Sequence, residues 1–351
     1  MAPELLLGPA PLVRRRGRTG SIMWRVVLAL SPVAALAVAA YGGPALLVLL
    51  ACVLGSLAGE GLGGLLWGKA RFFADGSAVL SGLLLALTLP PALAPGWAFA
   101  GGMLGTLVGR QLMGGLGGNL LNPALTGRLI LSLGAPGALE SAWRQPWSWR
   151  GTGFWEGLAA QDPLPLLHRT YLVLQELLSG ALPPLPAGWP AGERLDLIRH
   201  AQDLLAAAGA DHLLWPRLPG LMGEVSLLAL LPGLCWLFTA RLVDWRIPAS
   251  ILLVLPPALL LAAGGPAGAW MLPALYVKGT GLLLLISVFA SDPVTTPLGQ
   301  LAKFAYGLGV ALGLVALLVW GQSSCAFWGL ALGAGLLVPW LDRILVPRGL
   351  A

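Results

Sequence analysis

Charged residues are scarce in this chain: Asp, Glu, Lys and Arg make up 10% of its 351 residues, and hydrophobic residues make up 57%. Soluble domains are about a quarter charged, so an ordinary water-exposed surface is excluded for most of the chain. The three cysteines, Cys52, Cys235 and Cys325, stand singly, without the spacing of zinc or iron–sulfur ligands. We therefore predict no metal site and expect these cysteines to pack as apolar residues.

Motifs of soluble catalysis are also missing. There is no Walker loop, no dinucleotide-binding fingerprint after a strand and no Gly-x-Ser-x-Gly elbow. His168, His200 and His212 have spacings that fit no metal motif. The net charge of +6 lies at the ends of apolar blocks, which favours membrane topology over a nucleic-acid partner. We predict no catalytic residue and no nucleic-acid binding, and we expect no bond chemistry from this chain alone.

Long apolar blocks fill most of the sequence. A helix needs about 20 residues to cross a bilayer, and about ten blocks qualify, which predicts an all-α integral membrane protein. The expected spans are residues 24–41, 43–60, 77–92, 95–113, 122–135, 223–241, 247–264, 270–291, 303–320 and 326–345. The third and fifth are short and rich in Gly and Pro, so we expect some helices to be short or broken.

One hydrophilic stretch, residues 136–222, divides the spans into halves of five, at 24–135 and 223–345. It carries six of the 21 Lys and Arg residues but eight of the 15 Asp and Glu residues. The positive-inside rule therefore places it outside, and places residues 1–23 and 346–351 in the cytoplasm. Halves of opposite orientation are what an inverted repeat requires. The two halves also share a faint pattern, a short Gly-rich span beside a polar motif, for which the general similarity of Gly-rich membrane helices is the alternative explanation.

Ionisable side chains inside these spans are candidate functional residues, because charge in a bilayer is costly. They are Glu60, Arg110, Arg128, Glu224, Lys278 and Asp292. Glu60, Glu224 and Asp292 are the candidates for an ion pathway. Most of the six lie near predicted span ends, where a snorkelling side chain is the alternative.

Two polar breaks interrupt the spans. Between Arg110 and Arg128, glycines would let the backbone approach a ligand, and asparagines offer donors and acceptors; the residues are Gly114, Gly115, Gly117, Gly118, Asn119 and Asn122. The second break is residues 290–297, where Asp292, Thr295 and Thr296 offer oxygens beside two helix-stopping prolines. Polar backbone at membrane depth must line a cavity or be buried in protein, so the first break marks a site. For the second, an ordinary helix-ending turn is the alternative.

Several strings resemble the NqrB/RnfD family. They are Asp75-Gly76-Ser77 and its following helix, Gly109-Arg110-Gln111 with Asn122-Pro123-Ala124, Trp245-Arg246-Ile247-Pro248, and Ser291-Asp292-Pro293-Val294-Thr295. The similarity extends over nearly the whole chain, and the short N-terminus favours the RnfD branch. It implies a membrane core subunit of a flavin-dependent complex that moves electrons between ferredoxin and NAD, or from NADH to quinone, while driving Na⁺ or H⁺. Implied surroundings are the other subunits, membrane lipid and the bacterial inner membrane, with both termini cytoplasmic.

The family attaches one flavin mononucleotide (FMN) to a threonine of the outer loop. The corresponding position here is Asp162, within residues 157–164. An aspartate cannot form that ester, and its charge would repel the phosphate, so we predict that covalent FMN is absent. A shifted alignment would move the acceptor to Thr170 or Thr152. The resemblance still implies a non-covalent flavin, riboflavin or FMN, in the helical core. Its expected neighbours are Arg110, Gly114, Gly115, Gly117, Asn119, Asn122, Asp292, Thr295 and Thr296.

Two other functions stay open. Broken helices and inverted repeats also suit a stand-alone secondary transporter or channel. If both flavins are missing, the chain would be a structural subunit without a redox role.

Overall fold

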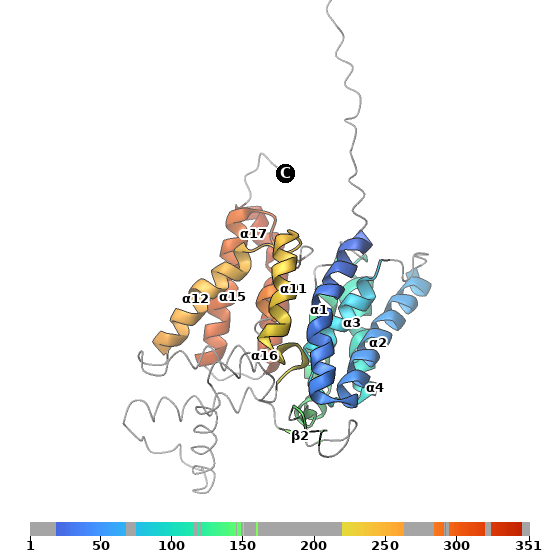
Figure 1. Cartoon of the computed structure of the whole chain (residues 1–351). Helices are drawn as coiled ribbons and strands as arrows, with labels where there is room; N and C mark the ends of the chain where they lie inside the picture. The colour runs from blue at the N-terminus through green and yellow to red at the C-terminus, as the bar shows by residue number, and fades with distance from the viewer. Residues whose placement is uncertain are drawn as a thin grey trace, which may run out of the picture.

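The computed structural model describes residues 19–67, 75–115, 118–119, 121–144, 146–148, 150, 159–160, 220–262, 284–290, 292, 295–319 and 324–345. Within these ranges the chain is almost entirely helical (Figure 1). The strands described are two residues each, β1 (Trp143–Arg144) and β2 (Ala159–Ala160), paired antiparallel. The predicted helical class is therefore confirmed, and the apolar helices are those of a membrane protein.

The first half starts with two long apolar helices, α1 (Thr19–Tyr41) and α2 (Gly43–Trp67). Shorter ones follow: α3 (Ser77–Leu87), α4 (Pro95–Thr106), which continues as the π-helical turn η1 (Leu107–Gln111), α5 (Pro123–Gly134) and α6 (Pro136–Glu140). α3 ends at Thr88, where Leu89-Pro90-Pro91 cannot continue a helix, because proline lacks the required N–H. The predicted short third and fifth helices are thus found.

The second half is built from η2 (Met222–Glu224), α11 (Leu227–Thr239), α12 (Arg246–Ala262), the π-helical turn η3 (Leu285–Phe289), α15 (Gln300–Val319), α16 (Ser324–Leu336) and α17 (Val338–Leu345). Among the described residues, three helices are long and apolar enough to cross a membrane: α1, α2 and most of α15. α16 and α17 together make a fourth candidate, bent by 42°. Of the predicted eighth span, only the end lies within the described residues.

Several observed boundaries differ from the predicted spans, and two of these differences change the interpretation. The sequence predicts that α2 ends at Glu60, but the helix continues to Trp67, so Glu60 lies inside it. The tenth span is predicted to run unbroken over 326–345, but it bends next to Leu337, just before Pro339. Pro339 has no N–H to bond to the preceding turn, and its ring clashes with the carbonyl four residues earlier, which explains the bend.

Glycines let α2 and α4 pack with their backbones almost in contact. A Cβ atom added at Gly55 would lie 2.1 Å from the carbonyl oxygen of Phe99, and one added at Gly59 would lie 2.5 Å from that of Met103. Small residues at such spacing are typical of helix pairs in membranes, where close van der Waals contact replaces the hydrophobic effect. This packing fixes α2, and with it Glu60, against η1.

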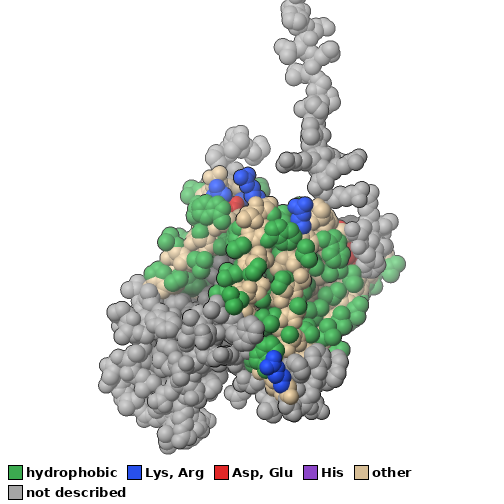
Figure 2. Space-filling model, in the orientation of Figure 1, with side chains coloured by type: hydrophobic (Ala, Val, Ile, Leu, Met, Phe, Trp, Pro, Cys, Tyr) green, Lys and Arg blue, Asp and Glu red, His purple; other side chains and the backbone are tan. Residues whose placement is uncertain are grey.

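On the face shown in Figure 2 many of the described side chains are apolar, and most of the Lys and Arg side chains lie at one end, with one group at the opposite end. The end with most of them carries the start of α1 and the whole of α17 (Figure 1). The basic residues on these and the adjoining segments are Arg25, Arg241, Arg246, Lys303 and Arg343. Trp24, Trp245 and Trp340 are more than half exposed on the same segments, as in an aromatic belt at a membrane surface. Of the cysteines, Cys52 is buried as predicted, but Cys235 is exposed.

Candidate functional site

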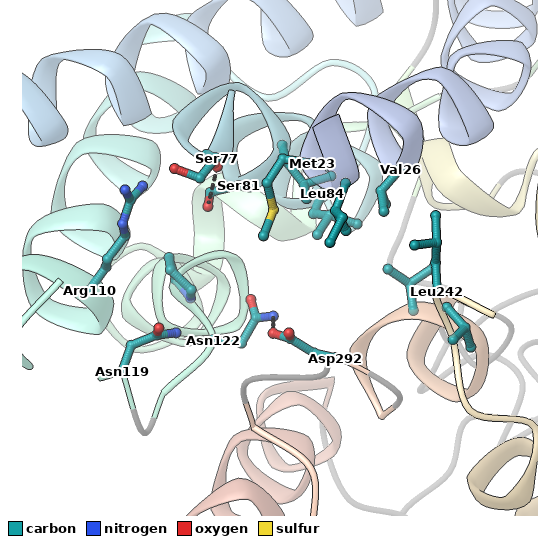
Figure 3. Close-up of a pocket in the computed structure, with 15 residues that line it drawn as sticks. Met23, Val26, Ser77, Ser81, Leu84, Arg110, Asn119, Asn122, Leu242 and Asp292 are labelled. Carbon is teal, nitrogen blue, oxygen red and sulfur yellow. Dashed lines mark hydrogen bonds between the residues drawn. The ribbon is translucent and has the colours of Figure 1, made fainter. Parts of the chain in front are cut away.

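A pocket lies where segments of both halves meet (Figure 3). The first half contributes α1, α3, η1 and the loop before α5, and the second contributes the α11–α12 connection and the region of Val288 and Asp292. Its polar lining residues are Ser77, Ser81, Arg110, Asn119, Asn122 and Asp292. The pocket contains about 780 Å³ of space not filled by atoms, its open mouth included. The lining, mostly apolar with a few polar groups, is typical of small-molecule sites.

Asn122 joins the two halves at this pocket. Its Oδ1 accepts hydrogen bonds from the backbone N–H groups of Ala124 at 3.0 Å and Leu125 at 3.4 Å, so it caps the N-terminus of α5. Proline at the next position favours the same helix start. The side-chain amide donates 2.8 Å to Oδ2 of Asp292, 170 residues later in the chain. The two predicted polar breaks are therefore in direct contact.

Arg110 also lines the pocket and belongs to a buried ion cluster. Its Nη2 lies 3.0 Å from Oε1 of Glu60 and 3.6 Å from Oδ2 of Asp75. The side chains of Arg110 and Glu60 are only 6% and 5% exposed. Arg110 lies in the π-helical turn η1, and such turns are rare and frequently found at functional sites. Glu60 is therefore the buried ion-pair partner of a pocket-lining residue, and its side chain does not snorkel to the membrane surface.

The Asp75-Gly76-Ser77 motif builds the rim of the pocket. Oδ1 of Asp75 accepts a hydrogen bond from the backbone N–H of Ser77 at 3.0 Å, which fixes the start of α3. Gly76 has a φ of 72°, and an added Cβ would lie 2.7 Å from the indole nitrogen of Trp24. Only glycine fits both the left-handed backbone and the close approach of α1.

The α11–α12 connection closes the pocket with Leu242 and Val243. It is held by Asp244, which accepts hydrogen bonds from Nζ of Lys303 at 2.7 Å and from the backbone N–H of Arg246 at 3.0 Å. Partial burial acts to raise the pKa of Asp244, but these hydrogen bonds and the two positive charges outweigh it. The net pKa of Asp244 is lower than usual.

The other predicted residues are placed differently. Gly114 and Gly115 have positive φ values of 103° and 95° but do not line the pocket. The backbone N–H of Thr295 donates 3.1 Å to the carbonyl of Asp292, so Thr295 and Thr296 flank the site without lining it. Glu224 is buried in η2, away from the pocket, where the N–H of Met222 donates to the carbonyl of Leu89. Arg128 is buried, with its guanidinium 5.8 Å from the ring centre of Trp328. Gly117, Thr152, Asp162, Thr170 and Lys278 lie outside the described residues.

Sequence reasoning missed several lining residues. Leu242 and Val243 are ordinary apolar residues of a loop, and Ser81 is a small residue of an apolar helix, so no local pattern distinguishes them. The sequence did single out Asp75, because Asp75-Gly76-Ser77 is one of the strings that resemble the NqrB/RnfD family.

Comparisons with known proteins agree along the whole chain. The model of the NQR2, RnfD, RnfE family matches residues 7–351. The D subunit of the ion-translocating oxidoreductase complex of Stutzerimonas stutzeri is 33% identical over 346 residues, which covers 95% of this chain and 92% of the relative. The D subunit of the Na⁺-translocating ferredoxin:NAD⁺ oxidoreductase complex of Acetobacterium woodii is 28% identical, over 92% of this chain and 89% of the relative. Its proton-translocating counterpart from Clostridium ljungdahlii is also 28% identical, over 89% and 86%. The resemblance found in the sequence is confirmed, and the chain belongs to the NQR2, RnfD, RnfE family.

Proposed function

We propose that the chain is the D-type membrane core subunit of a complex that couples electron transfer, of the ferredoxin:NAD⁺ type, to the translocation of Na⁺ or H⁺. The observation that carries this proposal is the pocket built by both halves and joined by the Asn122–Asp292 hydrogen bond, in a chain whose relatives are D subunits over nearly their full length. Its partners are then the other membrane and peripheral subunits.

The test is purification of a tagged chain from membranes of its own host. We expect co-purification with flavin and iron–sulfur subunits, and loss of ferredoxin:NAD⁺ activity in membranes of a deletion strain. A chain that purifies alone, and that transports a solute in liposomes, would instead support a stand-alone transporter. A deletion that removes the assembled complex but leaves the redox centres of the other subunits active would support a purely structural role.

The proposed arrangement is about ten helices in two inverted halves in the bacterial inner membrane, with both termini cytoplasmic. The gathering of cations and exposed tryptophans at the end of α1 and α17 supports this orientation. A tag inserted near Ala187 should be accessible only from outside intact cells.

We propose that a non-covalent flavin binds at this pocket. The ring system is flat and largely apolar, and its polar edge has alternating donors and acceptors that amides can match. Asn119 would face that edge, Arg110 would lie near its electron-rich oxygens, and the apolar side chains of α1 and α3 would cover the ring. When bound, the flavin supplies one- and two-electron redox chemistry. Purified complex in which no extractable flavin can be assigned to this subunit would count against the proposal.

Covalent FMN is proposed to be absent, because Asp162 stands at the position of the acceptor threonine. Mass spectrometry of peptides from residues 150–175 should find no flavin adduct. An adduct on Thr152 or Thr170 would overturn this proposal without touching the non-covalent site.

The proposed ion pathway includes Glu60, Asp292 and Glu224. The first two lie at or next to the pocket, and Glu224 is buried in η2, a separate segment. Burying a carboxylate in a membrane is costly, so such residues usually belong to an ion pathway or to a buried ion pair. Replacing Glu60 or Glu224 by Gln should lower ion transport more than electron transfer in membrane vesicles.

A further inference from the structure

Arg110 belongs both to a buried ion pair and to the lining of the pocket. One end of its guanidinium, Nη2, pairs with Glu60 at 3.0 Å and lies 3.6 Å from Asp75. The same side chain lines the pocket together with Asn119 and Asn122 (Figure 3). Since its side chain is only 6% exposed, water cannot screen either interaction effectively. The cation is thus placed between a buried carboxylate and the ligand space.

The hydrogen bonds of this pair are incomplete. A guanidinium has five N–H donors and a carboxylate has two acceptor oxygens. Among the described residues, Nε and Nη1 of Arg110 and Oε2 of Glu60 are buried without a hydrogen-bond partner. Buried polar atoms in folded proteins nearly always have partners, and each exception needs an explanation. These N–H groups have almost no accessible surface, so Arg110 acts on a ligand in the pocket mainly through its charge.

How strongly Arg110 interacts with a ligand depends on the other charges around the pocket. Two carboxylates, of Glu60 and Asp75, lie within 3.6 Å of the guanidinium of Arg110, and a third, of Asp292, also lines the pocket. A ligand that carries negative charge must therefore compete with Glu60 for the same cation. At low effective dielectric such competition is worth more than it would be in water.

We propose that Arg110 is a positioning residue that shares its guanidinium between Glu60 and the ligand of the pocket, so that the charge of Glu60 controls how strongly the pocket stabilises a ligand that has gained negative charge. The proposal rests on the proposed function, in which that ligand is a flavin. Linkage is reciprocal: neutralising Glu60 strengthens the hold of Arg110 on the ligand, and added charge on the ligand weakens its hold on Glu60 by the same factor. Glu60 then acts on the ligand through Arg110.

The experiment compares the purified complex with Glu60→Gln, with Arg110→Gln and with the double variant. Two quantities are measured: the flavin content assigned to this subunit, and the midpoint potential of that flavin by redox titration. A hydrogen bond to a charged group corresponds to about a tenfold change in relative affinity or more. For reduced against oxidised flavin, tenfold is about 30 mV in a two-electron couple. We expect Glu60→Gln to raise the potential by about that amount and Arg110→Gln to lower it similarly. Glu140→Gln is the control, because Glu140 is an exposed glutamate that does not line the pocket, and it should leave both quantities unchanged.

The double variant tests whether Glu60 acts through Arg110. If it does, Glu60→Gln has no effect on the potential once Arg110→Gln is present. An equal effect in both backgrounds, or an unchanged potential in both single variants, would overturn the proposal while the flavin site stands. Absence of this flavin from the wild-type complex would overturn the proposed flavin site, and this proposal with it. If Arg110→Gln alone fails to accumulate, the double variant removes the unpaired buried carboxylate, and Arg110→Lys, which keeps the charge but not the fork of donors, should lower the potential partially.

Discussion

Exchanging the partners of the hydrogen bond between the two halves is a direct test of the site. In Asn122→Asp, the new side chain can still accept from the N–H groups of Ala124 and Leu125, so the cap of α5 is kept. The donor to Asp292 is lost, and a second carboxylate replaces it at the position where the amide lay 2.8 Å from Oδ2. In the double variant Asn122→Asp with Asp292→Asn, donor and acceptor are simply reversed.

The magnitudes follow from these contacts. A hydrogen bond to a carboxylate contributes about 1.5–3 kcal/mol. Two carboxylates about 3 Å apart repel by about 5 kcal/mol at an effective dielectric constant of about 20. Protonation of one of them limits the real cost, so we expect Asn122→Asp to destabilise by about 3–5 kcal/mol. Asn122→Ala, which loses the cap at about 1 kcal/mol as well as the bond, should cost about 2–4 kcal/mol. The double variant should lie within about 1 kcal/mol of wild type.

Thermal unfolding of the purified complex in nanodiscs, followed by tryptophan fluorescence, gives the order of stability. Asp292→Asn alone is the control, because two amides can still form one hydrogen bond and should cost little. A double variant as unstable as Asn122→Asp, or an Asn122→Asp variant as stable as wild type, would refute the contact between the halves.

Three further predictions concern other contacts. Gly59→Val should displace α4 from α2 and sharply lower the amount of folded subunit in membranes, because a Cβ there lies 2.5 Å from the carbonyl of Met103; Gly96→Val, where an added Cβ meets nothing, is the control. Asp244 has a lowered pKa, so its stabilisation is present above the unfolded-state pKa of about 3.9 and is lost as the pH falls through the lower folded-state pKa. Asp244→Asn should therefore lower the unfolding temperature at neutral pH, by an amount worth about 1 kcal/mol or less, and the gap should close below pH of about 4; a gap that widens in acid would contradict the assignment. Trp328→Leu should lower the free energy of unfolding by about 2 kcal/mol or more, because the ring of Trp328 packs against Phe289 and Phe327 and beside buried Arg128. Trp236→Leu is the control: Trp236 is exposed, so the same unfolding measurement should show a much smaller loss.

Local chemistry made some of the site predictable from the sequence. Asparagine followed by proline predicts a helix start, and α5 begins at Pro123 with Asn122 as its cap. Polar, glycine-rich breaks in apolar blocks predict a protein-lined cavity, and Asn119, Asn122 and Asp292 line one. These inferences needed only neighbouring residues and the solvent properties of the bilayer.

The remaining features depend on contacts distant in sequence. Gly61, Gly63 and Gly64 resemble a helix end, but α2 continues through them, and Gly63 packs against Gln111. For that reason the sequence places Glu60 near a span end, although it lies buried beside Arg110, 50 residues later. The closure of the pocket by Leu242 and Val243 likewise depends on how the halves meet. Span counting also treats the last helix as straight, although Pro339 favours a bend there.

The most direct test of the central claim is an electron cryomicroscopy map of the purified complex at a resolution that shows cofactors. We predict flat, flavin-shaped density beside Asn119 and the hydrogen-bonded pair of Asn122 and Asp292, in reach of Arg110, and no flavin density joined to the side chain of residue 162. Lipid density filling the pocket, or a flavin joined to residues 150–175 with none between the halves, would contradict this prediction.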